Sequence, residues 1–214
     1  MKEQLRGWLA GERYQDIIEL AGRRRRVLSF LTALTYDPDP LISWRAVEAM
    51  GLAAARISDD DPEYVRVHLR RLMWLLNDES GGIGWRAPEM MGEIIRSRPE
   101  HFADFLPILI SILDMEEEDA IRFRAGTLWA IGRLAPVMPE AARSALPRII
   151  PCLDDPHPQT RGMAVWCLGQ LKAPRHLLVR PALLEDEGPV DFFSEGQLVR
   201  IQVGRLARAA LGSE

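Results

Sequence analysis

The sequence has almost no lysine, little cysteine and no long apolar run. Lysine occurs only at Lys2 and Lys172, so arginine makes up nearly all of the 27 basic residues. The 2 cysteines, Cys152 and Cys167, have neither CxxC spacing nor a neighbouring histidine cluster, so we expect reduced, packed thiols and no metal site. The apolar stretch at 105–113 is far shorter than a membrane span, and the first residues lack the apolar core of a signal peptide. We therefore expect a cytoplasmic protein with no membrane association.

The composition is that of a folded globular protein. The chain has 214 residues, of which 47% are hydrophobic and 27% charged. This length favours one domain over two small ones. The net charge is −4, which argues against a general nucleic-acid coat because such proteins are usually basic. A local basic groove is still compatible with this balance.

A repeat of about 40 residues runs through the chain. Residues 44–51 and 85–92 share the pattern W-R-A-x-E-x-M-G, and residues 124–132 and 161–169 share R-x-x-x-x-W-x-[IL]-G. A glycine recurs at the same place in each repeat, namely at Gly51, Gly92, Gly132, Gly169 and Gly204. Such a period is typical of helical solenoids or of propeller blades.

Apolar spacing favours helices over propeller strands. The apolar residues of 69–76 and 106–113 follow the i, i+3, i+4, i+7 spacing of one helix face, and strand-like alternation is nearly absent. Prolines just before acidic residues, such as Pro62, mark the first turn of a helix. Ser194 and Gln197 match a capping box ahead of a last helix. The sequence thus predicts two antiparallel helices, A and B, in each repeat.

Three residues carry a more specific resemblance. Pro147, Asp155 and Arg161 stand at the spacing that resembles the HEAT-repeat pattern, in which a proline bends helix A and an acid and an arginine flank the turn into helix B. The short B helices that end in x-x-L-G or A-x-G are similar to the PBS-lyase-type group of HEAT-like repeats. The resemblance implies an all-α fold, an α-solenoid (right-handed superhelix) of about five HEAT-like helix pairs with an N-terminal capping helix.

The same resemblance predicts the domain organisation. Residues 1–22 are expected to form the N-terminal capping helix or helices. A single HEAT-like repeat domain follows over 23–212. Its repeats are placed at about 23–58, 61–98, 100–136, 139–173 and 174–212. The last departs from the pattern, as a terminal repeat that faces water does.

Successive B helices begin with an equivalent arginine. These are Arg45, Arg86, Arg124 and Arg161, and an acid precedes three of them by six residues in the pairs Asp39/Arg45, Glu118/Arg124 and Asp155/Arg161. The favoured interpretation is a structural ladder, in which each arginine binds the acid of its own turn and of the next repeat. The alternative is a row of guanidinium groups along the concave groove, open to an acidic partner or a phosphate backbone.

The turn at 77–84 departs from the other repeats because it is longer and contains three glycines. Pro88 places the start of the following helix near Arg86 or Ala87, which leaves Trp85 in the turn. A glycine-rich turn before a helix can hold an anion, but no Gly-Lys-Ser/Thr follows, so a P-loop is not supported. A long turn without a ligand, a partner-binding loop and a small-anion site are the alternatives.

Aromatic and acidic residues flank the arginines of two repeats. Trp44 and Trp85 directly precede an arginine, and Glu48 and Glu89 follow one by three residues. Paired carboxylates in one groove suit acid–base work or cation binding, but no histidine or nucleophile motif accompanies them, so we name no catalytic residue, metal or cofactor. The candidate partner-binding residues are Trp85, Arg86, Glu89, Trp44, Arg45 and Glu48.

Four consecutive arginines form a basic patch: Arg23, Arg24, Arg25 and Arg26. Residues 1–36 carry 7 basic and 4 acidic side chains, so this segment is positive within an acidic chain. The patch is either a solvated helix end or a contact for nucleic acid or an acidic protein surface.

The leading functional hypothesis is a non-catalytic scaffold that binds a protein partner of unknown identity through the concave B-helix face and the turn at 77–86, as a monomer or weak dimer. The alternative is a DNA-binding or DNA-repair solenoid similar to HEAT-like alkylpurine glycosylases. The acidic balance and the acid-paired arginines disfavour nucleic acid. A minor alternative is a bilin-lyase-like enzyme or chaperone, which would need a chromophore partner that nothing in the sequence implies.

Overall fold

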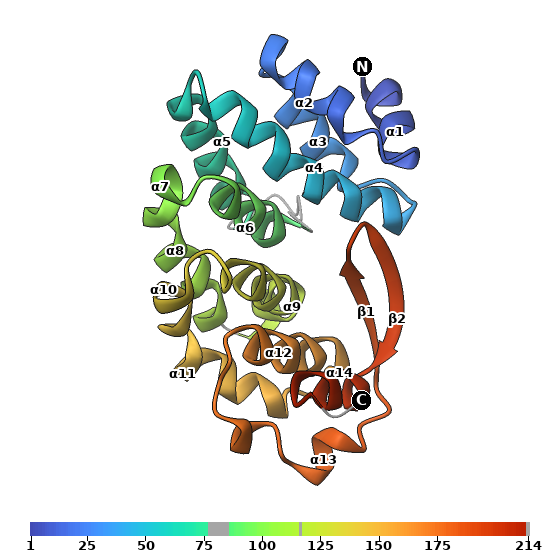
Figure 1. The fold of residues 1–214 in the computed structure, drawn as a ribbon, viewed down its shortest axis with the longest axis vertical. Coiled ribbons are helices and arrows are strands. Elements are labelled where there is room, and N and C mark those ends of the chain that lie inside the picture. The colour runs from blue at the N-terminus through green and yellow to red at the C-terminus, as the bar shows by residue number, and fades with distance from the viewer. Residues whose placement is uncertain (77–85, 116, 213–214) are drawn as a thin grey trace. The chain divides into compact units, whose positions relative to one another are not determined.

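The computed structural model of the chain describes residues 1–76, 86–115 and 117–212, and for residues 117–122 it describes the backbone alone. Helices make up most of the described residues, together with a two-stranded sheet (Figure 1). The predicted all-α class is therefore confirmed. None of the described helices is both long enough and apolar enough to cross a membrane.

The chain divides into two compact units, and each is described by itself. Unit 1 comprises Met1–Phe105 together with Ser194–Leu198. Unit 2 comprises Leu106–Phe193 together with Val199–Glu214. The division falls inside the stretch 100–136 that the sequence assigns to one repeat, so the repeat boundaries stay a prediction.

Three helices lie side by side at the centre of unit 1. Helix α4 packs against α2 and against α6, while α3 and α5 cover α4 as A helices (Figure 1). The helices of this unit are α1 (Lys2–Ala10), α2 (Tyr14–Arg23), α3 (Val27–Leu34), α4 (Pro40–Ser58), α5 (Pro62–Trp74), α6 (Ala87–Ser97), α7 (Pro99–Phe102) and the 3₁₀ turn η1 (Ala103–Phe105).

Unit 2 repeats this arrangement, since α12 packs against both α9 and α14. Short helical pieces take the place of continuous A helices. The elements of this unit are α8 (Leu106–Ser111), η2 (Ile112–Asp114), α9 (Glu117–Leu134), α10 (Pro139–Arg143), α11 (Leu146–Ile149), η3 (Ile150–Asp154), α12 (Pro158–Gln170), η4 (Arg175–Leu177), α13 (Pro181–Leu184) and α14 (Val203–Ala210).

Acidic caps and prolines fix where the helices of unit 1 begin. The Asp39 carboxylate accepts a hydrogen bond from the Leu41 N–H at 2.9 Å, directly before Pro40 in α4. The Asp61 carboxylate accepts from the Tyr64 N–H at 3.1 Å in α5. Each cap satisfies a backbone donor that has no partner within its own helix. The predicted first-turn proline is thus confirmed at Pro62 of α5, and Pro40 of α4, which was predicted to lie in a turn, occupies the same position.

The recurring glycines mark places where neighbouring B helices touch. A Cβ atom on Gly51 of α4 would lie 2.8 Å from the Glu93 backbone oxygen of α6. A Cβ atom on Gly132 of α9 would lie 2.3 Å from a ring carbon of Trp166 in α12. Both distances are shorter than van der Waals contact, so only glycine allows these helices to approach so closely. Close helix approach is therefore the physical reason for the repeated glycine.

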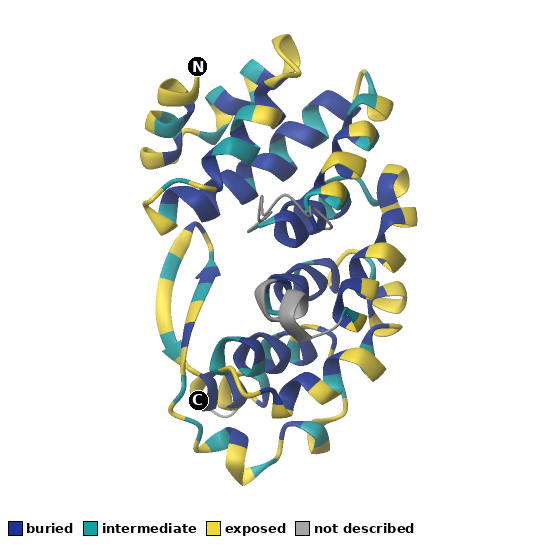
Figure 2. Ribbon diagram, turned by 180° about the vertical axis from the view of Figure 1, so that it is seen from behind, coloured by how far each residue is buried: buried dark blue, intermediate teal, exposed yellow. Residues whose placement is uncertain are grey.

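The B helices supply most of the buried core of each unit. Figure 2 shows α4 and α6 buried along most of their length, with exposed residues concentrated on the A helices. Met50 and Met90 are fully enclosed in unit 1, and Trp129 is 1% exposed in unit 2. The Trp129 indole N–H donates to the Phe193 carbonyl at 3.1 Å, so its polar atom is satisfied. Trp129 therefore has a packing role in unit 2.

Residues 189–202 form a β-hairpin, which the sequence alone did not predict. Its strands are β1 (Pro189–Ser194) and β2 (Gln197–Gln202). The interpretation of Ser194 and Gln197 as a capping box is therefore wrong, because both residues lie in strands beside the turn. The following helix, α14, begins only at Val203.

The hairpin has a clear local cause. The turn residues Glu195 and Gly196 both have positive φ, at 51° and 73°, as a tight two-residue turn between twisted strands requires. Val190 and Phe193 are buried, while Pro189 and Asp191 are exposed. A short run of β-forming residues followed by Glu-Gly is thus the sequence signal for this hairpin. The helical repeat pattern of the rest of the chain obscured that signal.

Candidate functional site

The predicted partner-binding residues come together on two adjacent helices of unit 1. Trp44, Arg45 and Glu48 lie on α4, Arg86 is the N-cap of α6, and Glu89 lies in the first turn of α6. Because α4 and α6 pack side by side, Trp44 and Arg86 contact each other, whereas Arg45 and Glu48 bind residues at α1 and α2. The turn at 77–84 and Trp85 lie outside the described residues.

Arg86 stacks on Trp44. Its guanidinium carbon lies 3.9 Å from the centre of the Trp44 ring, which is within the range of a cation–π contact. Its Nε donates to the Ser43 hydroxyl at 2.9 Å, and its Nη1 donates to the Glu89 carboxylate at 3.1 Å. Trp44 is 6% exposed, so the ring serves as a buried platform beneath a partly exposed guanidinium group.

Glu89 is a buried carboxylate with one unsatisfied oxygen. Its side chain is 4% exposed, and its Oε2 atom has no hydrogen-bond partner among the described residues. Burial raises the pKa of Glu89, and the nearby charge of Arg86 opposes that rise only in part. The site therefore holds a carboxyl group that gains a proton more readily than an exposed glutamate.

Arg45 has a structural environment that the sequence did not predict. Its Nη1 donates to the carbonyls of Leu9 and Ala10, each at 3.0 Å, and its Nε donates to the Gly196 carbonyl at 3.1 Å. Its Nη2 forms an ion pair with Glu12. These partners differ from the expected own-turn acid, Asp39, which instead caps α4. With 5% exposure, Arg45 is built into unit 1.

Two further polar pairs involve α2, α4 and α6. The Tyr14 hydroxyl of α2 donates to Glu48 of α4 at 2.8 Å, and burial raises the pKa of that hydroxyl. On α6, Glu93 is fully buried and paired with Arg96, whose Nη2 donates to it at 2.6 Å. Sequence reasoning missed Tyr14, Glu93 and Arg96 because they lie outside the repeated motif.

The ladder residues of unit 2 form pairs between neighbouring repeats. Arg124 donates to the Asp155 carboxylate at 2.6 Å. Arg161 donates to the Asp186 carboxylate at 2.7 Å and to the Asp155 backbone carbonyl at 2.8 Å. The Glu118 side chain lies outside the described residues. Both arginines therefore neutralise carboxylates inside the fold, since the side chains of Asp155 and Asp186 are only 3% and 11% exposed.

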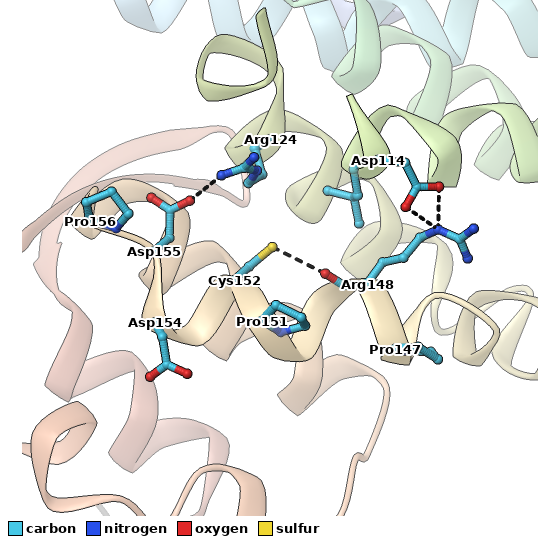
Figure 3. A pocket seen from close by; sticks show the side chains of 10 residues that line it. Asp114, Arg124, Pro147, Arg148, Pro151, Cys152, Asp154, Asp155 and Pro156 are labelled. Carbon is cyan, nitrogen blue, oxygen red and sulfur yellow. Dashed lines mark hydrogen bonds and ion pairs between the residues drawn. The ribbon is translucent and has the colours of Figure 1, made fainter. Parts of the chain in front are cut away.

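A hollow of about 360 Å³ in unit 2 is lined by charged side chains that bind one another. Figure 3 shows Arg148 paired with Asp114, and Arg124 paired with Asp155. The Cys152 thiol points to the Arg148 carbonyl at 3.4 Å, and burial raises its pKa to about 11. A thiol with this pKa is almost entirely protonated near neutral pH, so it is a poor nucleophile.

The basic patch, Arg23–Arg26, is exposed at the junction of α2 and α3. Within the described residues there is no group of three or more His, Cys, Asp or Glu side chains placed to hold a metal ion.

Comparison with known proteins agrees with the repeat pattern. Residues 121–171 match the family model for HEAT-like repeats. An uncharacterized protein of Archaeoglobus fulgidus is 34% identical over 113 residues, which cover 53% of this chain and 56% of that protein. The chain thus spans about half the length of the curated relative that it matches.

Solved structures share the fold at low sequence identity. The designed armadillo repeat protein YIII(Dq)4CqI has a TM-score of 0.54 and 21% identity, with 99% of this chain and 91% of that chain covered. The designed armadillo repeat protein YIII(Dq.V1)4CPAF, in complex with peptide (KR)4, has a TM-score of 0.52 and 22% identity, with 99% and 90% covered. The match and the shared architecture agree with the resemblance drawn from the sequence: residues 121–171 are similar to HEAT-like repeats, and the chain has an all-α solenoid fold.

Proposed function

We propose that this chain is a non-catalytic scaffold that binds a segment of a protein partner through the B-helix face of unit 1. The observation that carries the proposal is the preorganised Arg86. Its side chain is 22% exposed, and its Nη2 group makes no hydrogen bond to the described residues. A guanidinium group held over an aromatic ring by two hydrogen bonds offers fixed donors to a carbonyl or carboxylate of the partner.

The same face also offers acceptors. Glu48 is partly exposed beside Tyr14 and provides carboxylate oxygens, whereas Glu89 is buried and holds Arg86 in place. A face with both donors and acceptors matches the alternating carbonyl and N–H groups of a peptide backbone. Trp85 directly precedes Arg86 in the chain and belongs to the proposed surface on sequence grounds. Arg45 is buried, so we expect it to stabilise the helices that form this surface and not to contact the partner.

Two further observations favour a protein over a nucleic acid. Arg45 and Arg86 each bind a carboxylate of unit 1, so much of the positive charge that a phosphate backbone needs is already offset. In addition, the designed repeat protein with a TM-score of 0.52 was solved in complex with a peptide. A solenoid of this fold is therefore able to hold a peptide along its repeats.

The experiment is a selection of peptides from a random library against the immobilised protein, followed by affinity measurement of the selected peptides. We expect Arg86→Ala to weaken binding roughly tenfold, and Trp85→Ala to weaken it as well. Arg70→Ala is the matched control, because Arg70 is an exposed arginine of the A helix α5 that pairs with Glu63. Failure to select any peptide, or equal binding by the Arg86 and Arg70 variants, contradicts the proposal.

A further inference from the structure

A second cavity lies in unit 1, at the junction of α2 and α3. It has a volume of about 570 Å³ and is lined by Arg23, Arg24, Arg25, Arg26, Phe30 and Tyr64. Volumes of this size are typical of sites that enclose a small ligand or a few side chains. The four consecutive arginines are thus the rim of a hollow with aromatic walls, and not only a solvated helix end.

The arginines of this cavity differ in what they bind. Arg25 pairs with Asp61 at 2.5 Å, and its guanidinium carbon lies 5.8 Å from the centre of the Tyr64 ring. Arg23, Arg24 and Arg26 are exposed, and their side chains make no hydrogen bond or ion pair with the described residues. One acid therefore faces four guanidinium groups, which leaves a local excess of positive charge.

The two acids that precede Asp61 in the chain do not remove this excess, because other arginines already bind them. Asp60 accepts from Arg56 at 2.9 Å, and Asp59 accepts from Arg98 at 2.6 Å. Like charges held close together repel, so the cluster gains most from a ligand that brings negative charge. The carboxylates or phosphates of such a ligand would accept hydrogen bonds in the fork geometry that arginine favours.

We propose that this cavity binds an acidic segment of a protein partner, with carboxylates on the arginines and one large apolar side chain against Phe30 and Tyr64. The aromatic walls call for an apolar group as well as charge. An extended nucleic acid fits less well, because the positive area is confined to one inter-helix turn and the whole chain carries a net charge of −4. This site is separate from the Trp44 and Arg86 face, so it stands or fails independently of the proposed function.

The probe for this site is a short fluorescent peptide with a central phenylalanine flanked by aspartates and glutamates, whose binding is followed by anisotropy. We expect the double variant Arg24→Glu/Arg26→Glu to lose at least about tenfold in affinity at low salt. A peptide with serine in place of phenylalanine should bind several-fold more weakly. Circular dichroism checks folding, and Arg24→Gln/Arg26→Gln gives the same test without reversed charge.

The matched control is Arg205→Glu/Arg208→Glu, which makes the same charge change on α14 in unit 2. Equal losses in the two reversed variants would mean that binding follows net charge alone, and this result overturns the proposal. The proposal also fails if the wild-type protein does not bind the acidic peptide at millimolar concentration. Tighter binding of an oligonucleotide than of the peptide would assign the cavity to nucleic acid instead and would equally overturn it.

Discussion

The Arg86 guanidinium group lies over the Trp44 ring, with 3.9 Å between its guanidinium carbon and the ring centre. The two residues belong to consecutive B helices, so this contact joins the tryptophan position of one motif to the arginine position of the next. The repeated W-R dipeptide thus has a physical meaning: the tryptophan of one repeat supports the arginine of the next.

This contact predicts the effect of a conservative change. Arg86→Lys keeps the charge but loses the planar stack and the Nε bond to Ser43, so we expect a loss of about 1–2 kcal/mol in the free energy of unfolding. Urea denaturation followed by circular dichroism measures it. Arg70→Lys should change stability by less than about 0.5 kcal/mol, because an exposed lysine can still pair with Glu63. Equal effects at both positions would show that the stack contributes nothing.

Glu89 predicts a pH dependence with a definite sign. Because burial raises the pKa of Glu89 in the folded protein, the fold binds a proton here more strongly than the unfolded chain does. This contribution to stability is therefore present at low pH and is lost as pH rises from the ordinary carboxyl pKa of about 4.3 through the raised value. Glu89→Gln stays neutral, so its stability relative to wild type should increase over that range. A constant difference between the two proteins contradicts this assignment.

His68 predicts the opposite dependence. It is 5% exposed, its Nε2 lies 3.2 Å from the Thr32 hydroxyl, and burial, with a smaller effect from Arg71, lowers its pKa to about 4. The unfolded chain takes up a proton near pH 6.5, so stability is complete above that value and falls between pH 6.5 and 4. The loss should approach about 3 kcal/mol. His68→Gln should remove this part of the acid sensitivity, whereas His101→Gln, at an exposed position of unit 1, should leave it in place.

Helix contact predicts contrasting effects for two glycines. Gly51→Ala would place a methyl group against the Glu93 backbone oxygen at 2.8 Å, so we expect a loss of about 1–3 kcal/mol. Gly7 lies within α1 and a Cβ atom there meets nothing within 4 Å. Gly7→Ala should therefore stabilise the protein by about 0.5–1 kcal/mol. Thermal unfolding of both variants measures these two changes. Destabilisation by Gly7→Ala would contradict the explanation that helix contact determines the effect.

The sequence could predict features that depend on short fixed spacing. The helix starts at Pro40 and Pro62, and the close approach at Gly51, follow from motifs within one repeat or its neighbour. The partners of Arg45 could not be predicted in this way. Glu12 and Gly196 lie in segments with no repeat spacing relative to Arg45, and they meet it only through tertiary packing.

The burial of individual side chains could likewise not be predicted from the motif. Glu48 and Glu89 occupy equivalent motif positions, yet Glu48 is partly exposed while Glu89 is 3% exposed. The difference comes from their neighbours, because Tyr14 reaches Glu48 whereas Arg86 covers Glu89. The hairpin at 189–202 was missed for a related reason, since a terminal repeat need not keep the helical pattern.

The hairpin turn has a consequence for the synthesis of this protein. Gly196 is separated from Arg45 by 151 positions, and Gln197 is separated from Glu12 by 185 positions. At a translation rate of about 5–20 residues per second, the helices around Arg45 leave the ribosome roughly 10–30 seconds before the turn is made. A nascent chain that stops early leaves the Arg45 guanidinium group without one of its acceptors. The helices around Arg45 therefore reach their final hydrogen bonding only after the turn at Gly196 has been made.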